Sequence, residues 1–253
     1  MDTSVLFGSQ VTSMIIEVDY QQGAEPYTVN VGGEGSPWSL MALNFTKLFE
    51  ARPRPITIPT TIEDMQNIGQ AEDPDFTVDD VIKLAKTHRD HISSKEVPSF
   101  YILFLDGYFF ENNERQHGVL GISIGGTGMV AMFKPVIQST APQLNNTTVD
   151  DLVRHFGEQT TLVHELGHAI GLVNNGLALT TAHWDEENGR HCSNERCVMY
   201  YLNEGARDLL EFVQDLNLCL DGAETAQEED DCLVLFGGAC LGDANYAATL
   251  GAE

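Results

Sequence analysis

Two histidines and a glutamate in the stretch HELGH, His164 to His168, have the types and the spacing that metal-assisted hydrolysis requires. His164 and His168 are four residues apart, so on a helix they share one face and both imidazoles can reach one Zn²⁺ at about 2.0–2.1 Å. Zinc lowers the pKa of a bound water to about 7 and polarises a carbonyl. Glu165 can accept the proton of that water and deliver it to a leaving amine. The stretch predicts a zinc-dependent peptide hydrolase.

The helix that must carry these residues is indicated by the surrounding pattern. An HExxH pentapeptide also arises by chance, in helices whose histidines are merely surface or core residues. Here the span from Asp150 to Gly171 predicts one long helix, with HELGH late in it and Gly171 at its end. Its expected sheet-facing residues recur every three or four positions: Leu152, Val153, Phe156, Thr160, Val163, Gly167 and Ile170. This context favours the functional interpretation over chance.

The span from His164 to Gly171 resembles the metzincin clan of metallopeptidases, whose pattern is HExxHxxGxxH followed by a turn that contains methionine. The resemblance implies that Gly171 ends the helix and bends the chain back towards the metal. It then breaks, because Asn174 occupies the position of the third histidine and asparagine is a poor zinc ligand. A third ligand must therefore come from further along the chain, and His183 and His191 are the two candidates.

The stretch His191-Cys192-x4-Cys197-x-Met199 resembles the archaemetzincin form of the methionine turn. In matrixins and archaemetzincins the third histidine precedes the turn methionine by eight residues, as His191 precedes Met199. The resemblance implies His191 as the third ligand, after an insertion from Leu172 to Arg190, with Met199 packed beneath the metal. His183 stays an alternative, because no spacing rule forbids the nearer histidine.

A tyrosine after the methionine turn is the other catalytic candidate. Tyr201 matches the position at which some metzincins carry a tyrosine near the zinc, where its hydroxyl can stabilise an oxyanion. Tyr200 can equally be the inward-facing residue.

The cysteines gather in the C-terminal part of the chain, at Cys192, Cys197, Cys219, Cys232 and Cys240. Two explanations compete. Cys192 and Cys197 can form a small disulfide, with a second among the remaining three, or they can bind a second, structural zinc, as archaemetzincins do with a downstream CxxC. The chain contains no CxxC, which favours disulfides and therefore an oxidising compartment: secretion, the cell surface or the periplasm.

The pattern of the remaining chain predicts an α+β fold of the zincin-like kind, with a mixed twisted sheet covered by helices. Residues 1–172 form the expected N-terminal lobe, which ends in the HELGH helix, and residues 173–253 form a smaller cysteine-containing C-terminal lobe of one catalytic domain. The expected strands cover 13–20, 55–61, 99–110 and a glycine-rich hairpin over 117–137, and the further helices cover 38–51, 78–91 and 205–218.

The composition limits the partners. A net charge of −25, from 13 Lys plus Arg against 38 Asp plus Glu, argues against nucleic acid and anionic membranes. Such acidity is also compatible with weak surface binding of Ca²⁺, although no motif supports a Ca²⁺ site. The chain lacks an apolar run long enough to span a membrane, and its first four residues lack the features of a signal peptide. The expected partner is a protein or peptide substrate.

Two other functions fit part of the pattern. One is a binding protein on a peptidase scaffold that holds zinc without turnover, against which the intact Glu165 argues. The other is a zinc hydrolase outside the metzincins that uses a downstream glutamate as third ligand, for which Glu186 and Glu187 are available.

Overall fold

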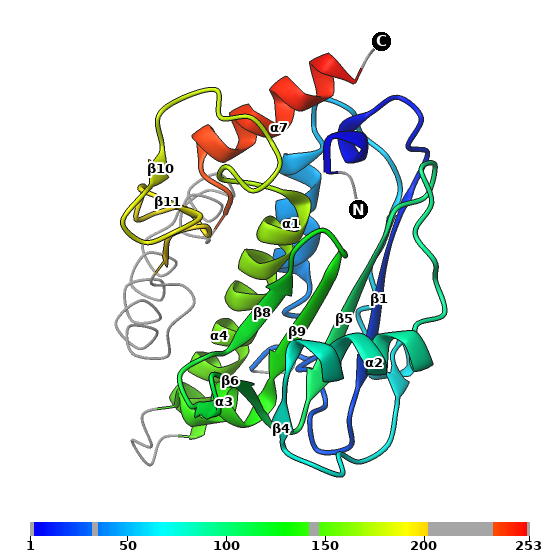
Figure 1. Cartoon of the computed structure of the whole chain (residues 1–253), viewed down its shortest axis with the longest axis vertical. Helices are drawn as coiled ribbons and strands as arrows, with labels where there is room; N and C mark the ends of the chain where they lie inside the picture. The colour runs from blue at the N-terminus through cyan, green and yellow to red at the C-terminus, as the bar shows by residue number, and fades with distance from the viewer. Residues whose placement is uncertain (1–2, 32–34, 142–146, 202–234, 252–253) are drawn as a thin grey trace.

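A computed structural model describes residues 3–31, 35–141, 147–201 and 235–251. The described chain combines one mixed sheet with five α-helices, as an α+β fold, and confirms the fold class at that level. Helices lie on both faces of the sheet, and the final helix returns to the end of the molecule where the chain begins (Figure 1).

The main sheet has the strand order β2-β1-β5-β9-β8, and β3 also pairs with β1. All of its pairings are parallel except β8–β9, which is an antiparallel hairpin at one edge. Its strands are β1 (Met14–Tyr20), β2 (Ile56–Thr57), β3 (Gln66–Asn67), β5 (Ser99–Leu105), β8 (Gly121–Ile124) and β9 (Met129–Phe133). Every residue of β5 is buried, as expected for a strand covered on both faces.

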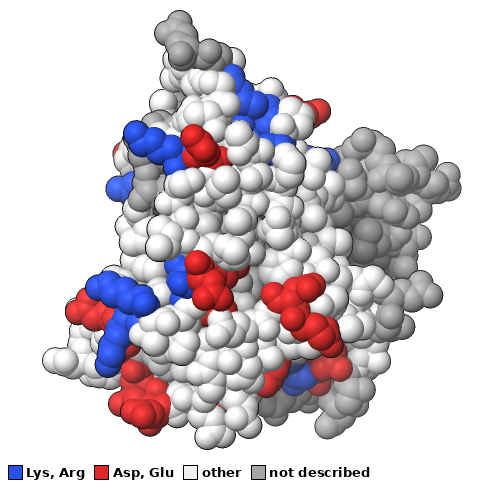
Figure 2. Space-filling model, turned by 90° about the vertical axis from the view of Figure 1, so that its right-hand side faces the viewer, with Lys and Arg blue, Asp and Glu red and all other residues white. Residues whose placement is uncertain are grey.

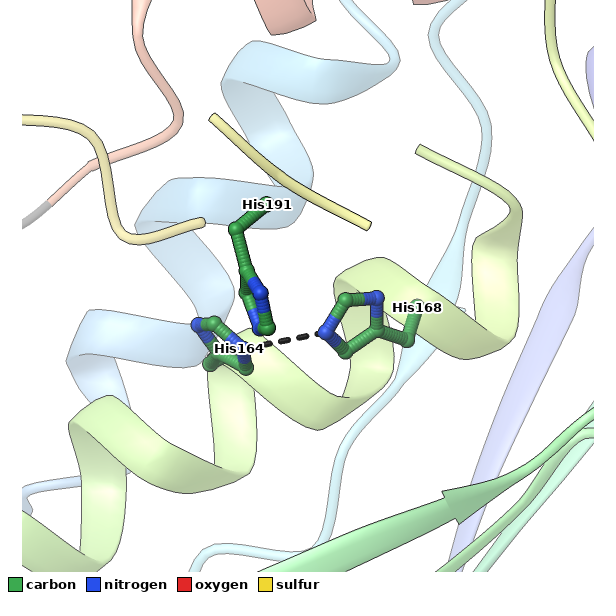
Figure 3. Close-up of side chains that lie close together, drawn as sticks. All are labelled: His164, His168 and His191. Carbon is green, nitrogen blue, oxygen red and sulfur yellow. Dashed lines mark hydrogen bonds between the residues drawn. The ribbon is translucent and has the colours of Figure 1, made fainter. Parts of the chain in front are cut away.

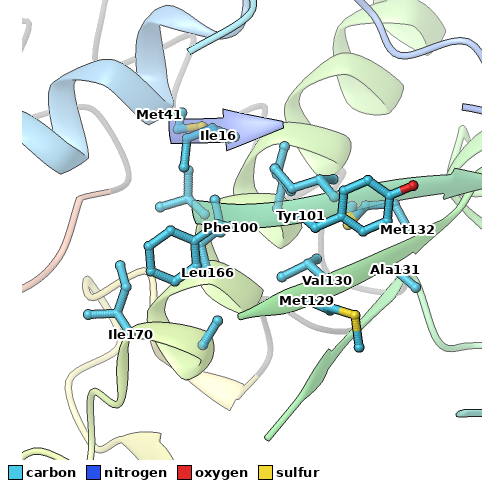
Figure 4. Close-up of a cluster of buried hydrophobic side chains, with 14 of the residues drawn as sticks. Ile16, Met41, Phe100, Tyr101, Met129, Val130, Ala131, Met132, Leu166 and Ile170 are labelled. Carbon is cyan, nitrogen blue, oxygen red and sulfur yellow. The ribbon is translucent and has the colours of Figure 1, made fainter. Parts of the chain in front are cut away.

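Three helices form the layers beside the sheet. The helices α1 (Ser39–Leu48) and α4 (Thr147–Ile170) lie against each other, and α4 also packs on β8 and β9. On this face Met41 of α1 and Leu166 and Ile170 of α4 join Ile16 and Phe100 of the sheet in the buried core (Figure 4). The helix α2 (Val78–His88) packs against β5, and Arg89 at its C-terminal end lies over the Tyr101 ring.

A smaller sheet and short helices complete the described chain. The small sheet has the order β4-β6-β7, formed by β4 (Asp75–Phe76), β6 (Tyr108–Glu111) and β7 (Glu114–Gln116). The short helices are η1 (Thr3–Phe7), η2 (Ile62–Asp64) and α3 (Lys134–Ser139). The strand β10 (Trp184–Asp185) pairs with β11 (His191–Cys192). The last described helix is α7 (Gly238–Leu250).

The expected elements are largely present, with three corrections. The strand expected over 99–110 is two strands, because the chain turns at Gly107, where a side chain would meet the Pro74 carbonyl oxygen at 2.2 Å. The hairpin expected over 117–137 is present as β8 and β9, but it ends at Phe133, since Pro135 lies in the first turn of a helix, α3. Of the span 55–61, only Ile56 and Thr57 form a strand. The helix expected over 205–218 lies outside the described residues.

The C-terminal helix packs back onto the N-terminal part of the chain. Arg52, just after α1, donates hydrogen bonds from its guanidinium to the carbonyls of Ala248 and Gly251 at the end of α7. A cation at this end of a helix is favourable for the helix dipole. The division into two lobes stays a prediction, but α7 belongs spatially with α1 and η1.

The surface in Figure 2 carries Lys and Arg side chains beside Asp and Glu side chains, in small groups separated by uncharged residues. No patch of a single charge sign covers the described part of that face. Across the described residues, no helix is both long and apolar enough to cross a membrane.

Candidate metal centres

Helix α4 carries His164 and His168 and ends where the sequence predicts. Gly171 follows the helix with a φ of +100°, and a side chain there would also meet Thr3 at 2.9 Å. The backbone N–H groups of Gly171 and Leu172 both donate to the Gly167 carbonyl and close the last turn. Asn174, in the position of the missing third histidine, is exposed and has a φ of +57°.

His191, and not His183, lies with the two helical histidines. One ligand nitrogen from each of His164, His168 and His191 lies within 4.8 Å of the other two (Figure 3). The Nε2 atoms of His164 and His168 are 3.0 Å apart. Because nitrogens on a tetrahedral zinc are about 3.3 Å apart, the three imidazoles need only small adjustments to hold one ion. The described residues thus include a group that can bind a metal.

Hydrogen bonds to backbone carbonyls fix the tautomers of two of these histidines. Nδ1 of His164 donates to the Val198 carbonyl at 2.7 Å, and Nδ1 of His191 donates to the Asn188 carbonyl. A carbonyl can only accept, so both Nδ1 atoms carry a proton, and in the neutral rings both Nε2 atoms have a lone pair. This is the outer-shell arrangement that orients metal-binding histidines.

Met199 packs against Gly167, the glycine of HELGH. A side chain on Gly167 would lie 2.2 Å from the Met199 sulfur, so this position must be glycine for the methionine to approach the helix. Met199 is completely buried. The preceding residue, Val198, supplies the carbonyl for His164, so the methionine turn holds the helix at two adjacent points.

A cleft with a volume of about 720 Å³ is lined by two of the three histidines, His168 and His191. Its lining residues are Phe109, Gly118, Val119, Gly121, Ile122, Ser123, Gly125, Glu165, His168, Asn175, Arg190, His191 and Tyr201. Glu165 therefore faces the same space as two of the histidines. Tyr201 lines the cleft and Tyr200 does not, although their rings are only 4.8 Å apart.

The edge strand β8 forms one wall of the cleft and lies close to Glu165. A side chain on Gly121 would meet Glu165 Cγ and Thr161 Cγ2 at 3.2 Å and the Met132 sulfur at 2.9 Å. Glycine here allows strand and helix to approach closely and leaves the Glu165 carboxylate its place. Within the described chain, β8 pairs with β9 only, so its other edge borders the cleft.

A second cluster contains His183 with three cysteines. Nδ1 of His183 lies 3.5 Å from the Cys192 sulfur and 3.9 Å from the Cys240 sulfur, and the Cys197 and Cys240 sulfurs are 3.5 Å apart. His183 is 5% exposed and all three cysteines are fully buried. His183, Cys192 and Cys240 form the second group of described residues that can hold a metal ion, with Cys197 beside them.

The surroundings of the second cluster suit a metal. Nε2 of His183 contacts Asp243 Oδ2 at 2.8 Å, which leaves Nδ1 directed at the sulfurs. The other Asp243 oxygen accepts from the Thr180 amide and hydroxyl. The Gly237 N–H donates to the Cys197 sulfur at 3.1 Å, a bond that favours a thiolate there.

The pKa values of the three thiols in this cluster shift in opposite directions. Hydrogen bonds from Cys197 and Cys240 lower the pKa of Cys192, while their contacts with Cys192 raise the pKa of Cys197 and of Cys240. Three thiolates cannot share this buried space unless a positive ion compensates their charge.

The expected disulfide between Cys192 and Cys197 is not formed, and Cys240 forms no disulfide with either of them. A bonded pair requires about 2.05 Å between sulfurs, whereas Cys197 and Cys240 are 3.5 Å apart. Cys219 and Cys232 lie outside the described residues. The inference of an oxidising compartment depended on the disulfides, so this part of the chain no longer supports it.

The short strand β11 supplies one residue to each cluster. Asp185 pairs with His191 and Trp184 with Cys192, so the hairpin holds both residues in extended backbone. Adjacent residues of a strand point to opposite faces. His191 therefore faces the cleft while Cys192 faces His183 and α7.

The sequence offered His183 as an alternative third ligand of the first centre and did not predict its place beside the cysteines. The signal was present: Cys192 and Cys197 have the spacing of half a zinc site, and a histidine can complete such a site as well as a CxxC can. Glu186 and Glu187, considered as third ligands for the first centre, are exposed and belong to neither described cluster.

Comparisons of this chain with known protein families, with curated proteins and with solved structures found no match.

Proposed function

We propose that the protein is a zinc-dependent endopeptidase of the zincin-like, metzincin-related kind, with zinc bound by His164, His168 and His191. The observation that carries this proposal is the convergence of three histidine nitrogens at a cleft that Glu165 also lines. Three neutral imidazoles and an open fourth position are a donor set typical of catalytic zinc. An edge strand beside the cleft suits an extended peptide, because it can pair with the peptide backbone.

In the proposed hydrolysis each residue of the cleft has a separate role. When bound, zinc supplies a Lewis acid and a water of lowered pKa. Glu165 accepts the proton from the attacking water and returns it to the leaving amine. The Tyr201 hydroxyl, on the cleft wall, donates to the oxygen that develops negative charge. The Val198 and Asn188 carbonyls hold two imidazoles in the required tautomer.

The test of this mechanism is Glu165→Gln in the zinc-loaded protein. The variant keeps the shape of the side chain and loses the base, so we expect unchanged zinc content and a fall of about 100- to 10,000-fold in the cleavage rate of an unfolded protein substrate. Glu187→Gln is the matched control, because Glu187 is exposed and outside the cleft lining. An unchanged rate in Glu165→Gln contradicts the mechanism.

A non-catalytic zinc-binding protein predicts a different result. In that case the unaltered protein and Glu165→Gln both bind zinc and both stay at the background rate on every peptide offered.

We further propose that His183, Cys192, Cys197 and Cys240 bind a second, structural zinc. This rests on the burial of all four side chains and on the Asp243 contact that orients His183. A closed four-ligand set of histidine and cysteine is typical of structural zinc. Zinc analysis of protein purified under reducing conditions should therefore find two ions per chain, and a value of one in the unaltered protein would contradict the second site.

A further inference from the structure

Arg190 is the one Lys or Arg side chain among the described residues that line the cleft. The other residues that line the cleft include the apolar Phe109, Val119 and Ile122 and one carboxylate, Glu165. Arg190 is exposed and lines the cleft, so an anion that enters the cleft can reach its positive charge.

The guanidinium of Arg190 is held in place by the loop that follows α4. Its Nη1 donates to the Asn174 carbonyl at 2.9 Å and to Asn175 Oδ1 at 2.6 Å. Asn175 in turn donates from Nδ2 to the His168 carbonyl at 2.8 Å. Arg190 is also the residue before His191. The guanidinium is thus connected to His168 through Asn175, and the Arg190 backbone is joined directly to His191. The guanidinium lies at the end of the cleft where His168 lies.

Of the guanidinium nitrogens, only Nη1 donates these hydrogen bonds. Within the described chain, Nε and Nη2 of Arg190 have no hydrogen-bond partner and no carboxylate forms an ion pair with it. An arginine whose position is already fixed loses little entropy when its remaining N–H groups bind a ligand.

The backbone conformation of the loop explains why the Asn174 carbonyl accepts a hydrogen bond from Arg190. Val173 and Asn174 both have positive φ, at +52° and +57°, a conformation that asparagine tolerates better than most residues. This winding turns the Asn174 carbonyl to the guanidinium. The position at which a metzincin carries its third histidine therefore positions a cation at the cleft in this chain.

We propose that Arg190 determines substrate specificity by binding a carboxylate of the peptide, close to the scissile bond and on the His168 side of the metal centre. A carboxylate is the anion that matches the planar N–H groups of a guanidinium, with short, charge-assisted bonds. The carboxylate belongs either to an Asp or Glu side chain or to the C-terminus of a short peptide. This inference rests on the proposed peptidase function.

The cleavage test uses matched peptide sets that carry Glu, Gln or Lys at each position around the scissile bond, with free or amidated C-termini. We expect one position at which Glu raises kcat/KM about tenfold or more over Gln. If the terminal carboxylate is the ligand, the free C-terminus gives that gain instead. Arg190→Gln should bring the ratio close to one, and Arg190→Glu should favour Lys.

The matched control is Arg196→Gln, since Arg196 is exposed in the same segment and does not line the cleft. It should keep the preference of the unaltered protein. If Arg190→Gln slows Glu and Gln peptides equally, Arg190 only stabilises the loop and the inference fails. The inference also fails if the preference for Glu persists in Arg190→Gln.

Binding separates this inference from the proposed catalysis. The dissociation constants of the same peptides are measured on zinc-loaded Glu165→Gln and on Glu165→Gln with Arg190→Gln. A Glu or free-carboxylate preference that disappears with Arg190 supports the inference even if no peptide is cleaved. Equal binding of all peptides by Glu165→Gln contradicts it, whatever the cleavage rates are.

Discussion

The two candidate metal centres lie on opposite faces of β11 and differ in how they meet solvent. The first has three histidine nitrogens, one of them on the half-buried His168, and it borders a cleft of about 720 Å³. The second has a histidine and three sulfurs, all buried, and an aspartate behind the histidine. An open site leaves a position for a substrate, whereas a closed site uses its ligands to hold segments together. We therefore expect opposite consequences when each is damaged.

Removal of the closed site should have the largest effect on folding. In Cys240→Ser, α7 loses its link to Cys197 and to the β10–β11 hairpin, and binding of structural zinc contributes about 10–16 kcal/mol in small zinc-finger peptides. We expect one zinc fewer per chain and a lowered midpoint of thermal unfolding. His168→Ala is the comparison, because it removes an open-site ligand; an equal loss of stability in both variants would contradict the distinction.

We expect the shape of the open site to depend more on the contacts that hold α4 in place than on a bound metal ion. Glu158 of α4 is fully buried and accepts from Lys134 Nζ at 2.5 Å and from the Tyr27 N–H at 2.8 Å. Glu158→Gln leaves the Lys134 charge buried and uncompensated, so we expect a loss of about 3–5 kcal/mol in the free energy of unfolding by urea.

The control for this prediction replaces both partners, as Lys134→Met with Glu158→Leu. It should recover most of the loss, because no unpaired charge remains. If the double variant is as unstable as Glu158→Gln, the packing of the two side chains and not their charge anchors the helix.

The sequence predicted the open site better than the closed one, for a physical reason. His164, Glu165, His168 and Gly171 act within one helix, whose period alone fixes their geometry. Met199 and His191 were implied by the resemblance of the stretch from His191 to Met199 to the archaemetzincin methionine turn. The closed site depends on His183, Cys192 and Cys240, which are brought together only when α7 returns to the hairpin. The spacing of Cys192 and Cys197 indicates half of such a site, but the approach of His183 and Cys240 is long-range packing without a local signal. The contacts of Arg190 with the 174–175 loop are also non-local.

A buried carboxyl group away from both centres should make stability depend on pH without any metal. Burial raises the pKa of Asp19 to about 6 from an ordinary value of 3.8, and the carboxyl accepts from the Tyr101 hydroxyl at 2.5 Å. The folded state thus binds the proton more tightly than the unfolded state, so stability is lost as pH rises from about 4 to 6.

Asp19→Asn removes this titration and keeps an acceptor for Tyr101. Relative to the unaltered protein, we expect its free energy of unfolding to improve between pH 4 and pH 6.5, by up to about 3 kcal/mol. The measurement is urea unfolding of both proteins across that range. A difference that does not change with pH would show that Asp19 does not titrate in this way.

The smallest effect should come from the aspartate behind the closed site. Asp243→Asn weakens the orientation of His183 and leaves all four proposed ligands in place, so we expect a fall of about 10- to 100-fold in the affinity for the second zinc. Competition with a chelator measures this loss. The first zinc should keep its affinity in the variant, and an equal loss at both centres would show that the two are not separate.

The central claim, that one short strand serves two metal centres of different kinds, is tested most directly by the zinc content of two variants of neighbouring residues. The unaltered protein should bind two zinc ions, and His191→Ala and Cys192→Ser should each bind one. The zinc retained by His191→Ala should have sulfur ligands in its X-ray absorption spectrum, and the zinc retained by Cys192→Ser should have nitrogen and oxygen ligands only. Loss of the same ion in both variants, or of none, would contradict the account.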